Sequence, residues 1–392
     1  MARRNTFNTI LAMAAGAATA ATVIEYNRQK RAAMAVLGRD SRLVETDLGL
    51  AEIATLGDGP AVLVLHGALA GYEQGLLIGK PLAEAGYQVI APSRPGYLRT
   101  PAIQDMSFIG QADFLAGLLD ALKIKQAIVL GMSAGGPTAI QLAARHPDRV
   151  RALLLFSAIS QRAFVDPENE SAAAWMFGNL MYNDFTTWLA IQSVLRSLPL
   201  LALSEPDGWR ARLVASPRLR AWYEKLVWAL FPSSPRLAGA LSDKNLVETM
   251  GSLPLAKVAA PTLVVHGALD ELVPFEHGEN SASKIPGARF LPLPAGDHAC
   301  MISFDEVVWP ESLLFLQRPS TTARRAPARK PAAKPAEKKP ATRRRAAKPA
   351  EPVPEPASAP RRRTRRTPAA SSDESTAAPA APRRRRTTTT ES

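Results

Sequence analysis

Residues 127–145 read AIVLGMSAGGPTAIQLAAR, and this stretch decides the fold. Its first four residues form a short apolar run suited to a buried strand, and residues 134–145 have apolar side chains at helical spacing. Between them, residues 131–135 (GMSAG) fit the pattern G-x-S-x-G. So tight a turn strains the serine backbone, and the two glycines avoid clashes of Cβ atoms. We therefore predict that Ser133 is a nucleophile at the carboxyl edge of a sheet, with a helix N-cap serine as the alternative.

On both sides of this stretch, apolar runs alternate with helical patterns, which is typical of βαβ units and a mostly parallel sheet. The predicted strands are residues 42–47, 50–56, 61–65, 87–91, 127–130, 150–156, 262–265 and 289–293, and the predicted helices are 76–85, 108–122, 134–145, 275–285 and 304–316. From about residue 160 to residue 255 the strand runs stop, and five of the six tryptophans fall in this helical, aromatic segment. The pattern predicts an α/β fold with a helical insertion.

A serine hydroxyl needs an imidazole to take its proton, and the imidazole needs a carboxylate to orient it. His298 is the candidate base among five histidines, because it lies in the loop after the last predicted strand. Asp270 is the candidate acid, 28 residues earlier and after the strand TLVVHG, with Glu271 and Asp297 as rivals. The other interpretations are a loop histidine satisfied by its neighbours and a turn aspartate that binds its own backbone.

Acyl transfer also requires two hydrogen-bond donors for the oxyanion. The backbone N–H of Ala134, which follows the nucleophile, is one candidate, and the N–H of Ala68 in the loop HGAL (66–69) is the other. His66 in that loop is predicted to be structural rather than catalytic, because one imidazole is already assigned.

From residue 42 to residue 316 the chain resembles the α/β-hydrolase fold proteins of the broad hydrolase-1 type. The matching pieces are HGALAG (66–71), SRPGY (93–97), GMSAGG (131–136), GALDELVP (267–274) and GDH (296–298). The resemblance implies a mostly parallel central sheet flanked by helices and a helical cap at about 160–255. Met132 departs from the pattern, because many relatives have His or Gln before the serine. The N- and C-terminal extensions also lie outside the resemblance.

The nucleophile and the motifs narrow the reaction. Similar haloalkane dehalogenases and epoxide hydrolases carry Asp at the position of Ser133, and neither HExxH nor GxGxxG occurs. One cysteine, Cys300, excludes an internal disulfide and an all-cysteine zinc site. We therefore expect a hydrolase without metal or cofactor, acting on a lipophilic ester or a related carbonyl substrate. The alternatives are a C–C bond hydrolase, a perhydrolase, and a non-catalytic scaffold.

The N-terminal 39 residues are predicted to be a signal peptide or membrane anchor with a linker. Arg3 and Arg4 precede an uncharged run, residues 5–24, which is long enough to span a bilayer but only weakly hydrophobic. The residues Ala17, Thr19 and Ala21 have the small-residue pattern of a cleavage site. We expect a membrane-associated or exported protein; a soluble helix on a cytoplasmic protein is the alternative.

The C-terminal residues 319–392 hold 20 Lys and Arg against 6 Asp and Glu, a net charge of +14 in a chain of net charge +13. The remainder is therefore close to neutral and has no basic stripe for nucleic acid. Frequent proline and clustered like charges predict a disordered basic tail. Its candidate partners are acidic lipids, an anionic polymer or nucleic acid, and a solvated spacer is the alternative. The oligomeric state is left open.

Overall fold

The computed structural model describes residues 2–162, 171–205 and 208–317, with side chains from residue 17 onward. The predicted basic tail lies outside the described residues. The strands are β1 (Arg42–Thr46), β2 (Gly49–Leu56), β3 (Ala61–Leu65), β4 (Gln88–Pro92), β5 (Ala127–Met132), β6 (Val150–Phe156), β7 (Thr262–Gly267) and β8 (Arg289–Leu293). The helices are α1 (Ala2–Val36), α2 (Tyr72–Glu84), α3 (Phe108–Ala121), α4 (Gly136–Arg145), α5 (Ala172–Leu180), α6 (Asp184–Ser204), α7 (Trp209–Ala215), α8 (Pro217–Trp228), α9 (Leu237–Thr249), α10 (Glu276–Lys284), α11 (Cys300–Ser303) and α12 (Asp305–Gln317), with short 3₁₀ turns η1 (Ser133–Gly135), η2 (Ser234–Arg236) and η3 (Leu255–Lys257).

The strands form one sheet in the order β1-β2-β4-β3-β5-β6-β7-β8. The β1–β2 and β2–β4 pairs are antiparallel, and every pair from β4 to β8 is parallel. Parallel strands end at the same edge of a sheet, so the loops after β3, β5, β7 and β8 meet there. The predicted α/β fold with a mostly parallel sheet is confirmed.

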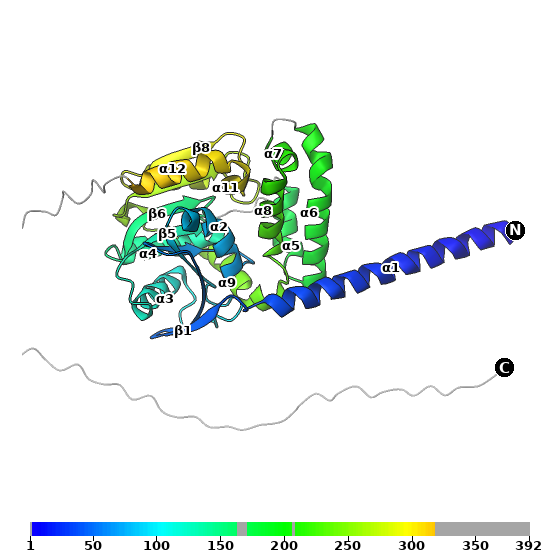
Figure 1. Cartoon of the computed structure of the whole chain (residues 1–392), viewed down its shortest axis with the longest axis horizontal. Helices are drawn as coiled ribbons and strands as arrows, with labels where there is room; N and C mark the ends of the chain where they lie inside the picture. The colour runs from blue at the N-terminus through cyan, green and yellow to red at the C-terminus, as the bar shows by residue number, and fades with distance from the viewer. Residues whose placement is uncertain (1, 163–170, 206–207, 318–392) are drawn as a thin grey trace, which may run out of the picture. The chain divides into compact units, whose positions relative to one another are not determined.

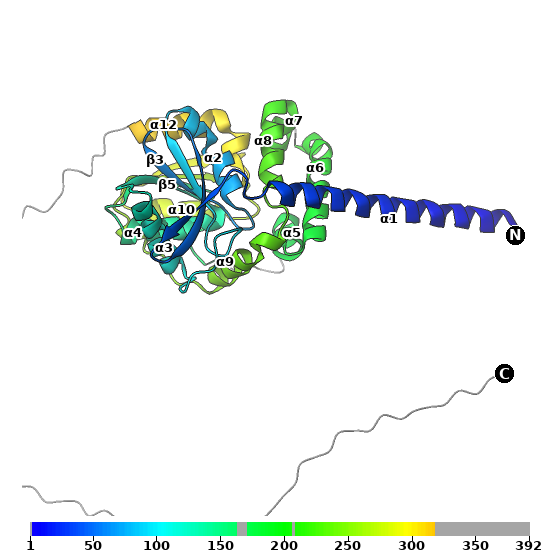
Figure 2. The same ribbon diagram turned by 60° about the horizontal axis from the view of Figure 1, so that its bottom comes forward.

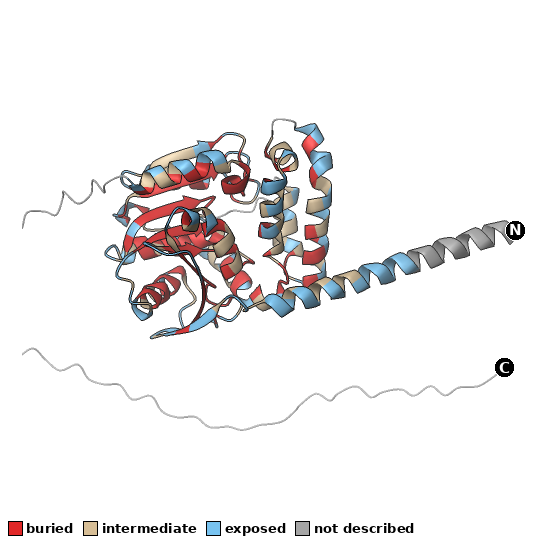
Figure 3. Ribbon diagram, viewed as in Figure 1, coloured by how far each residue is buried: buried red, intermediate tan, exposed pale blue. Residues whose placement is uncertain are grey.

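Both faces of the sheet are covered, and β3 shows how its sequence allows this. Leu63 and Leu65 pack with α3 and α4 on one face, whereas Val62 and Val64 pack with α2 and α12 on the other. Side chains alternate between faces along a strand, so a strand buried on both sides must be apolar throughout. The ribbon and its burial colouring show this helix–sheet–helix arrangement (Figures 1 and 3).

Helix α2 begins at Tyr72, four residues before the predicted start. The added first turn contains Gly75, which the packing of the helix requires. A Cβ atom at Gly75 would lie 2.7 Å from Ala91 Cβ on β4, so only glycine allows the helix to approach the strand this closely.

Helices α5 to α9 lie between β6 and β7 and form the predicted helical cap, with α5 and α6 on its outer side (Figures 1 and 2). The cap has its own contacts with the core: Trp209, Leu213 and Leu226 join the hydrophobic cluster that contains β3 and α12. Among the aromatic residues of the insertion, Trp209, Trp222 and Tyr223 thus pack against the core.

Helix α1 runs without a break through the uncharged segment and the segment predicted to be a linker. Its C-terminal half contacts the cap: the Tyr26 ring lies 5.2 Å from the Phe185 ring, and Lys30 Nζ lies 2.7 Å from Asp184 Oδ2. Residues 26–33 are thus part of the folded body. The sequence did not predict that these residues pack on the cap, because α1 has no distinct apolar face.

Candidate active site

Ser133 lies at the turn between β5 and α4, and its backbone has the left-handed φ of 51°. The neighbouring glycines make this turn possible. A Cβ atom at Gly131 would lie 2.6 Å from Ala139 Cβ, and one at Gly135 would lie 2.6 Å from the Leu65 carbonyl oxygen. The sequence therefore holds the serine in a strained conformation at the carboxyl edge of the sheet, as its motif predicts.

Asp270 and His298 follow β7 and β8, which lie beyond β6 in the sheet, and their side chains are hydrogen-bonded. His298 Nδ1 lies 2.8 Å from Asp270 Oδ2 and 3.0 Å from Oδ1. Asp270 Oδ1 also accepts backbone N–H bonds from Leu272 (2.9 Å) and Val273 (2.8 Å). Asp270 thus binds its own turn as well as the imidazole, so the two interpretations of this residue are compatible.

The two loops that carry these residues are joined by their backbones. The N–H of Ala268 donates to the Leu293 carbonyl (2.9 Å), and the N–H of Leu269 donates to the Gly296 carbonyl (2.8 Å). A Cβ atom at Gly267 would lie 2.3 Å from Gly296 O, so no side chain fits between the loops. This contact sets the distance between the aspartate and the histidine independently of the cap.

The pair has the electrostatics of a base and its orienting carboxylate. Burial alone would lower the pKa of His298, but the charge of Asp270 and the hydrogen bonds to it outweigh burial, so this pKa is raised. Burial alone would raise the pKa of Asp270, yet His298 and His266 hold it below its usual range. Asp270 is therefore ionised at neutral pH and can stabilise a protonated imidazole.

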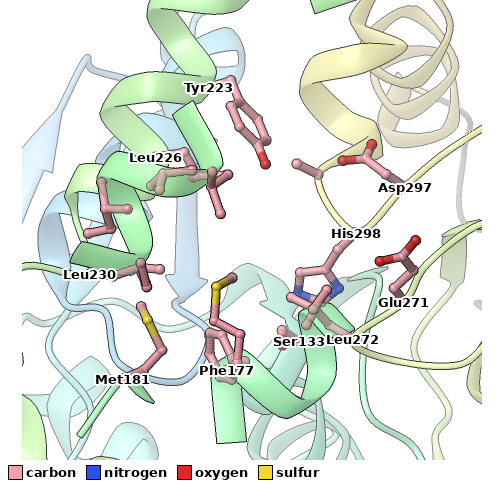
Figure 4. A pocket seen from close by; sticks show the side chains of 18 of the residues that line it. Ser133, Phe177, Met181, Tyr223, Leu226, Leu230, Glu271, Leu272, Asp297 and His298 are labelled. Atoms are coloured by element: carbon pink, nitrogen blue, oxygen red, sulfur yellow. The ribbon is translucent and has the colours of Figure 1, made fainter. Parts of the chain in front are cut away.

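Ser133 and His298 line one pocket of about 370 Å³. Figure 4 shows both side chains at one end of it, facing a wall built by the cap. The cap contributes mostly apolar side chains, among them Met176, Phe177, Met181, Ile191, Leu226 and Leu230. Tyr223 and Asp297 form a more polar part of the wall (Figure 4). An apolar cavity with few polar groups suits a lipophilic ligand.

The loop after β3 brings Ala68 to the pocket wall. The N–H of Gly67 is taken up by Gln74 Oε1 (2.8 Å), whereas within the described residues the N–H of Ala68 has no hydrogen-bond partner. A Cβ atom at Gly67 would lie 3.2 Å from Ser133 Cβ, which shows how closely this loop approaches the serine. The second predicted donor, Ala134, is buried directly after Ser133 and is not on the pocket wall.

A buried arginine, Arg94, supports the same loop. Its Nε donates to the His66 carbonyl (3.0 Å) and its Nη2 to the Gly67 carbonyl (3.3 Å). Its guanidinium also pairs with Asp243 of α9, which accepts a 2.5 Å bond from Tyr97 Oη as well. Arg94 thus connects the cap to the backbone that precedes Ala68. In the sequence, SRPGY (93–97) stands out only through the family resemblance, and no pattern in the cap sequence points to Asp243.

The remaining candidates have other partners. Nε2 of His66 accepts from the Arg94 N–H (2.9 Å), which agrees with a structural role. Glu271 is half-exposed and lies 3.7 Å from Arg210, and Asp297 accepts from Ser303 Oγ (2.6 Å). Burial raises the pKa of Asp297 to about 6. In the part of the chain that the structure describes, no group of three His, Cys, Asp or Glu side chains could hold a metal ion.

Comparison with known proteins shows the family to which the chain belongs. The family model of the alpha/beta hydrolase fold matches residues 60–304. An alpha/beta hydrolase fold protein from Nakamurella multipartita is similar in structure, with a TM-score of 0.59 and 32% identity over 70% of this chain and 98% of that one.

Relatives named for two different reactions are similar to this chain. A pimeloyl-(acyl-carrier protein) methyl ester esterase of Neisseria meningitidis is 27% identical over 226 residues, which cover 58% of this chain and 81% of the esterase. A 2-hydroxymuconate semialdehyde hydrolase of Pseudomonas putida is 30% identical over 240 residues, which cover 59% of this chain and 78% of that hydrolase.

Proposed function

Because this chain belongs to the alpha/beta hydrolase family, we propose that it is a serine hydrolase that cleaves a lipophilic carboxylic ester through an acyl-enzyme. The observation that carries the proposal is that His298, hydrogen-bonded to Asp270, lines the same pocket as the strained Ser133. This arrangement combines a nucleophile, a base and an orienting carboxylate at one edge of the sheet.

In the proposed reaction, His298 Nε2 takes the proton of Ser133 Oγ as the oxygen attacks the ester carbonyl. The N–H groups of Ala68 and Ala134 stabilise the oxyanion of the tetrahedral intermediate, and His298 then protonates the leaving alcohol. A water molecule, deprotonated by the same imidazole, releases the acid from the acyl-enzyme. Asp270 keeps its charge throughout and stabilises the imidazolium form of His298.

The lining of the pocket supports a substrate with an acyl chain or another apolar group. Cap side chains such as Phe177, Met181 and Leu230 offer no charge or hydrogen bond to a ligand, so selectivity rests on the apolar area that is removed from water. Each buried methylene group contributes about 0.8 kcal/mol. The value of kcat/KM should therefore rise with acyl length until the cavity is full.

A panel of p-nitrophenyl esters of increasing acyl length tests this proposal. We expect turnover that increases from acetate to medium chains and that is lost, by at least about 10³-fold, in Ser133→Ala. An unchanged ester turnover in Ser133→Ala would overturn the proposal.

A C–C bond hydrolase with the same three residues is the second candidate, because a 2-hydroxymuconate semialdehyde hydrolase is among the relatives. The same panel, extended with a vinylogous diketone and with peracid formation from acetate and peroxide, separates the reactions. A kcat/KM for the diketone that exceeds every ester by tenfold would favour C–C cleavage, and a dominant peroxide-dependent rate would favour a perhydrolase.

A further inference from the structure

Helix α6 has apolar side chains on the side that faces away from the pocket. Phe185, Leu189, Leu200 and Leu203, which we call the outer face of α6, are 38%, 47%, 71% and 78% exposed. Residues of the opposite side, such as Leu198, are buried against the pocket. In the described parts of the chain Leu189, Leu200 and Leu203 are therefore exposed, whereas Phe185 at the N-terminal end also contacts Tyr26 of α1.

The pocket reaches the surface beside this face. Leu201 lines the pocket and is 42% exposed, and Leu269 lines it from the opposite side and is 49% exposed. Ala172 and Glu271 are the other exposed residues of the lining, so the pocket is open among the C-terminal part of α6, the start of α5 and the loop after β7. Leu200 and Leu203 neighbour Leu201 along α6, so the outer face adjoins this opening.

The N-terminal end of α6 is held by α1. Trp188 Nε1 donates to Gln29 Oε1 (2.8 Å), and the ion pair of Lys30 with Asp184 lies one turn away. The Tyr26 ring packs on the same tryptophan, with 5.8 Å between ring centroids. The direction of α1 is therefore coupled to the cap through three different contacts.

Beyond these contacts α1 leaves the body. All residues from 17 to 24 are exposed, and they belong to the uncharged run 5–24. Figures 1 and 2 both show α1 projecting from the side of the body on which α6 lies. About 20 uncharged helical residues match the hydrocarbon thickness of a bilayer, and Arg28 and Arg31 then fall where lipid head groups lie.

We propose that the phospholipid bilayer that receives residues 5–24 also receives the outer face of α6, so that the mouth of the pocket faces lipid. Among the residues whose side chains the structure describes, from residue 17 onward, α6 is the one helix whose length and composition would allow it to cross a membrane. Its inner side lines the pocket, so it lies on the bilayer surface, as an interfacial amphipathic helix does. Arg196 is exposed on the outer face of α6, and in this arrangement its guanidinium extends to the lipid head groups.

This arrangement deepens the proposed function and rests on it in one respect: it identifies the substrate as an ester dissolved in the bilayer. An acyl chain could then pass from lipid to Ser133 along Leu201 and Leu198, which line the pocket, without entering water. The docking itself is independent of the reaction and can be measured without turnover.

The first test places an environment-sensitive NBD label at Leu203→Cys in the full-length chain, reconstituted in phosphatidylcholine/phosphatidylglycerol vesicles. Cys300 is buried and its thiol pKa is raised, so it does not compete for the label. Leu314→Cys on α12, 46% exposed, is the matched control. We expect doxyl lipids to quench the label at position 203 at least threefold more than at 314. Equal quenching at both positions overturns the proposal.

The second test compares Leu200→Glu/Leu203→Glu with Val307→Glu/Leu314→Glu, whose residues are exposed on α12. We expect the first variant to keep its kcat/KM for a soluble short-chain ester within twofold and to lose at least tenfold on a long-chain ester embedded in vesicles. The control variant should keep both activities. An unchanged vesicle activity in the first variant contradicts the docking. Quenching at position 203 without ester turnover would instead retain the docking and refute the proposed function.

Discussion

Removing the carboxylate of Asp243 should both destabilise the fold and slow the reaction. Arg94 is fully buried, and its ion pair with Asp243 is 97% removed from solvent on the aspartate side. Asp243→Ala leaves the guanidinium uncompensated and deprives Tyr97 Oη of its acceptor. Breaking one partner of such a buried pair costs about 3–5 kcal/mol. For a body of about 300 residues, with an unfolding entropy of about 2.1 cal/mol/K per residue, we expect the melting temperature to fall by roughly 5–8 °C.

The same change should reach the active site through the β3 loop. Arg94 holds the His66 and Gly67 carbonyls, which precede the proposed donor Ala68. A guanidinium released from Asp243 shifts this backbone, and we expect kcat to fall about tenfold, a part of the 10²- to 10³-fold cost of losing a whole oxyanion donor. KM should change less, because the apolar pocket wall stays in place.

Calorimetry at fixed scan rate and ester kinetics measure these two effects. Asp120→Ala is the matched control, because Asp120 is 71% exposed in its ion pair with Arg149 and should contribute less than about 1 kcal/mol. If Asp243→Ala is no more destabilising than Asp120→Ala, the reasoning on the buried pair is refuted. If it is destabilising but leaves kcat unchanged, the connection to the oxyanion loop is wrong.

Three further predictions concern the pocket. The pKa of His298 is raised above its ordinary value of 6.5, and the protonated imidazole cannot act as a base. We therefore expect kcat/KM to fall as the pH is lowered, with a midpoint above 6.5. A pH–rate profile with a neutral ester measures this midpoint. Asp297 has its pKa raised to about 6, so its neutral form stabilises the fold at low pH and this stability is lost as pH rises through 6. The change in unfolding free energy caused by Asp297→Asn should therefore be about 3 kcal/mol more favourable at pH 8 than at pH 4. Equal shifts in melting temperature at both pH values would contradict this. Gly67→Ala places a methyl group 3.2 Å from Ser133 Cβ, a tight contact that shifts the serine, and kinetics should show at least a tenfold loss of kcat/KM with little change in melting temperature.

The sheet could be predicted from the sequence because its central strands are buried on both sides. Residues 61–65 and 127–130 must be apolar at every position, which leaves an uninterrupted pattern. Strand β6 was predicted with its observed bounds, Val150–Phe156, for the same reason. The start of α2 was not predicted, because Gly75 has low helix propensity. The structure uses this glycine to let the helix approach β4 closely, which the sequence does not show.

The sequence could predict those residues of the candidate site that directly follow a predicted strand. Ser133, Asp270 and His298 each follow a strand, and parallel strands bring their loops to one edge. The contact of Arg94 with Asp243 spans 149 residues and joins a loop to the cap, so no local pattern signals it. The same holds for the packing of Tyr26 on α6, since both partners look like ordinary helix residues.

Labelling by a fluorophosphonate probe, followed by peptide mass spectrometry, tests the central claim most directly. We expect the folded full-length chain to be modified at Ser133, and His298→Ala to reduce the rate of modification at least a hundredfold, because the hydroxyl then has no base. Stoichiometric modification at Ser133 that is equally fast in His298→Ala would contradict the claim, as would a folded wild-type chain whose Ser133 remains unmodified.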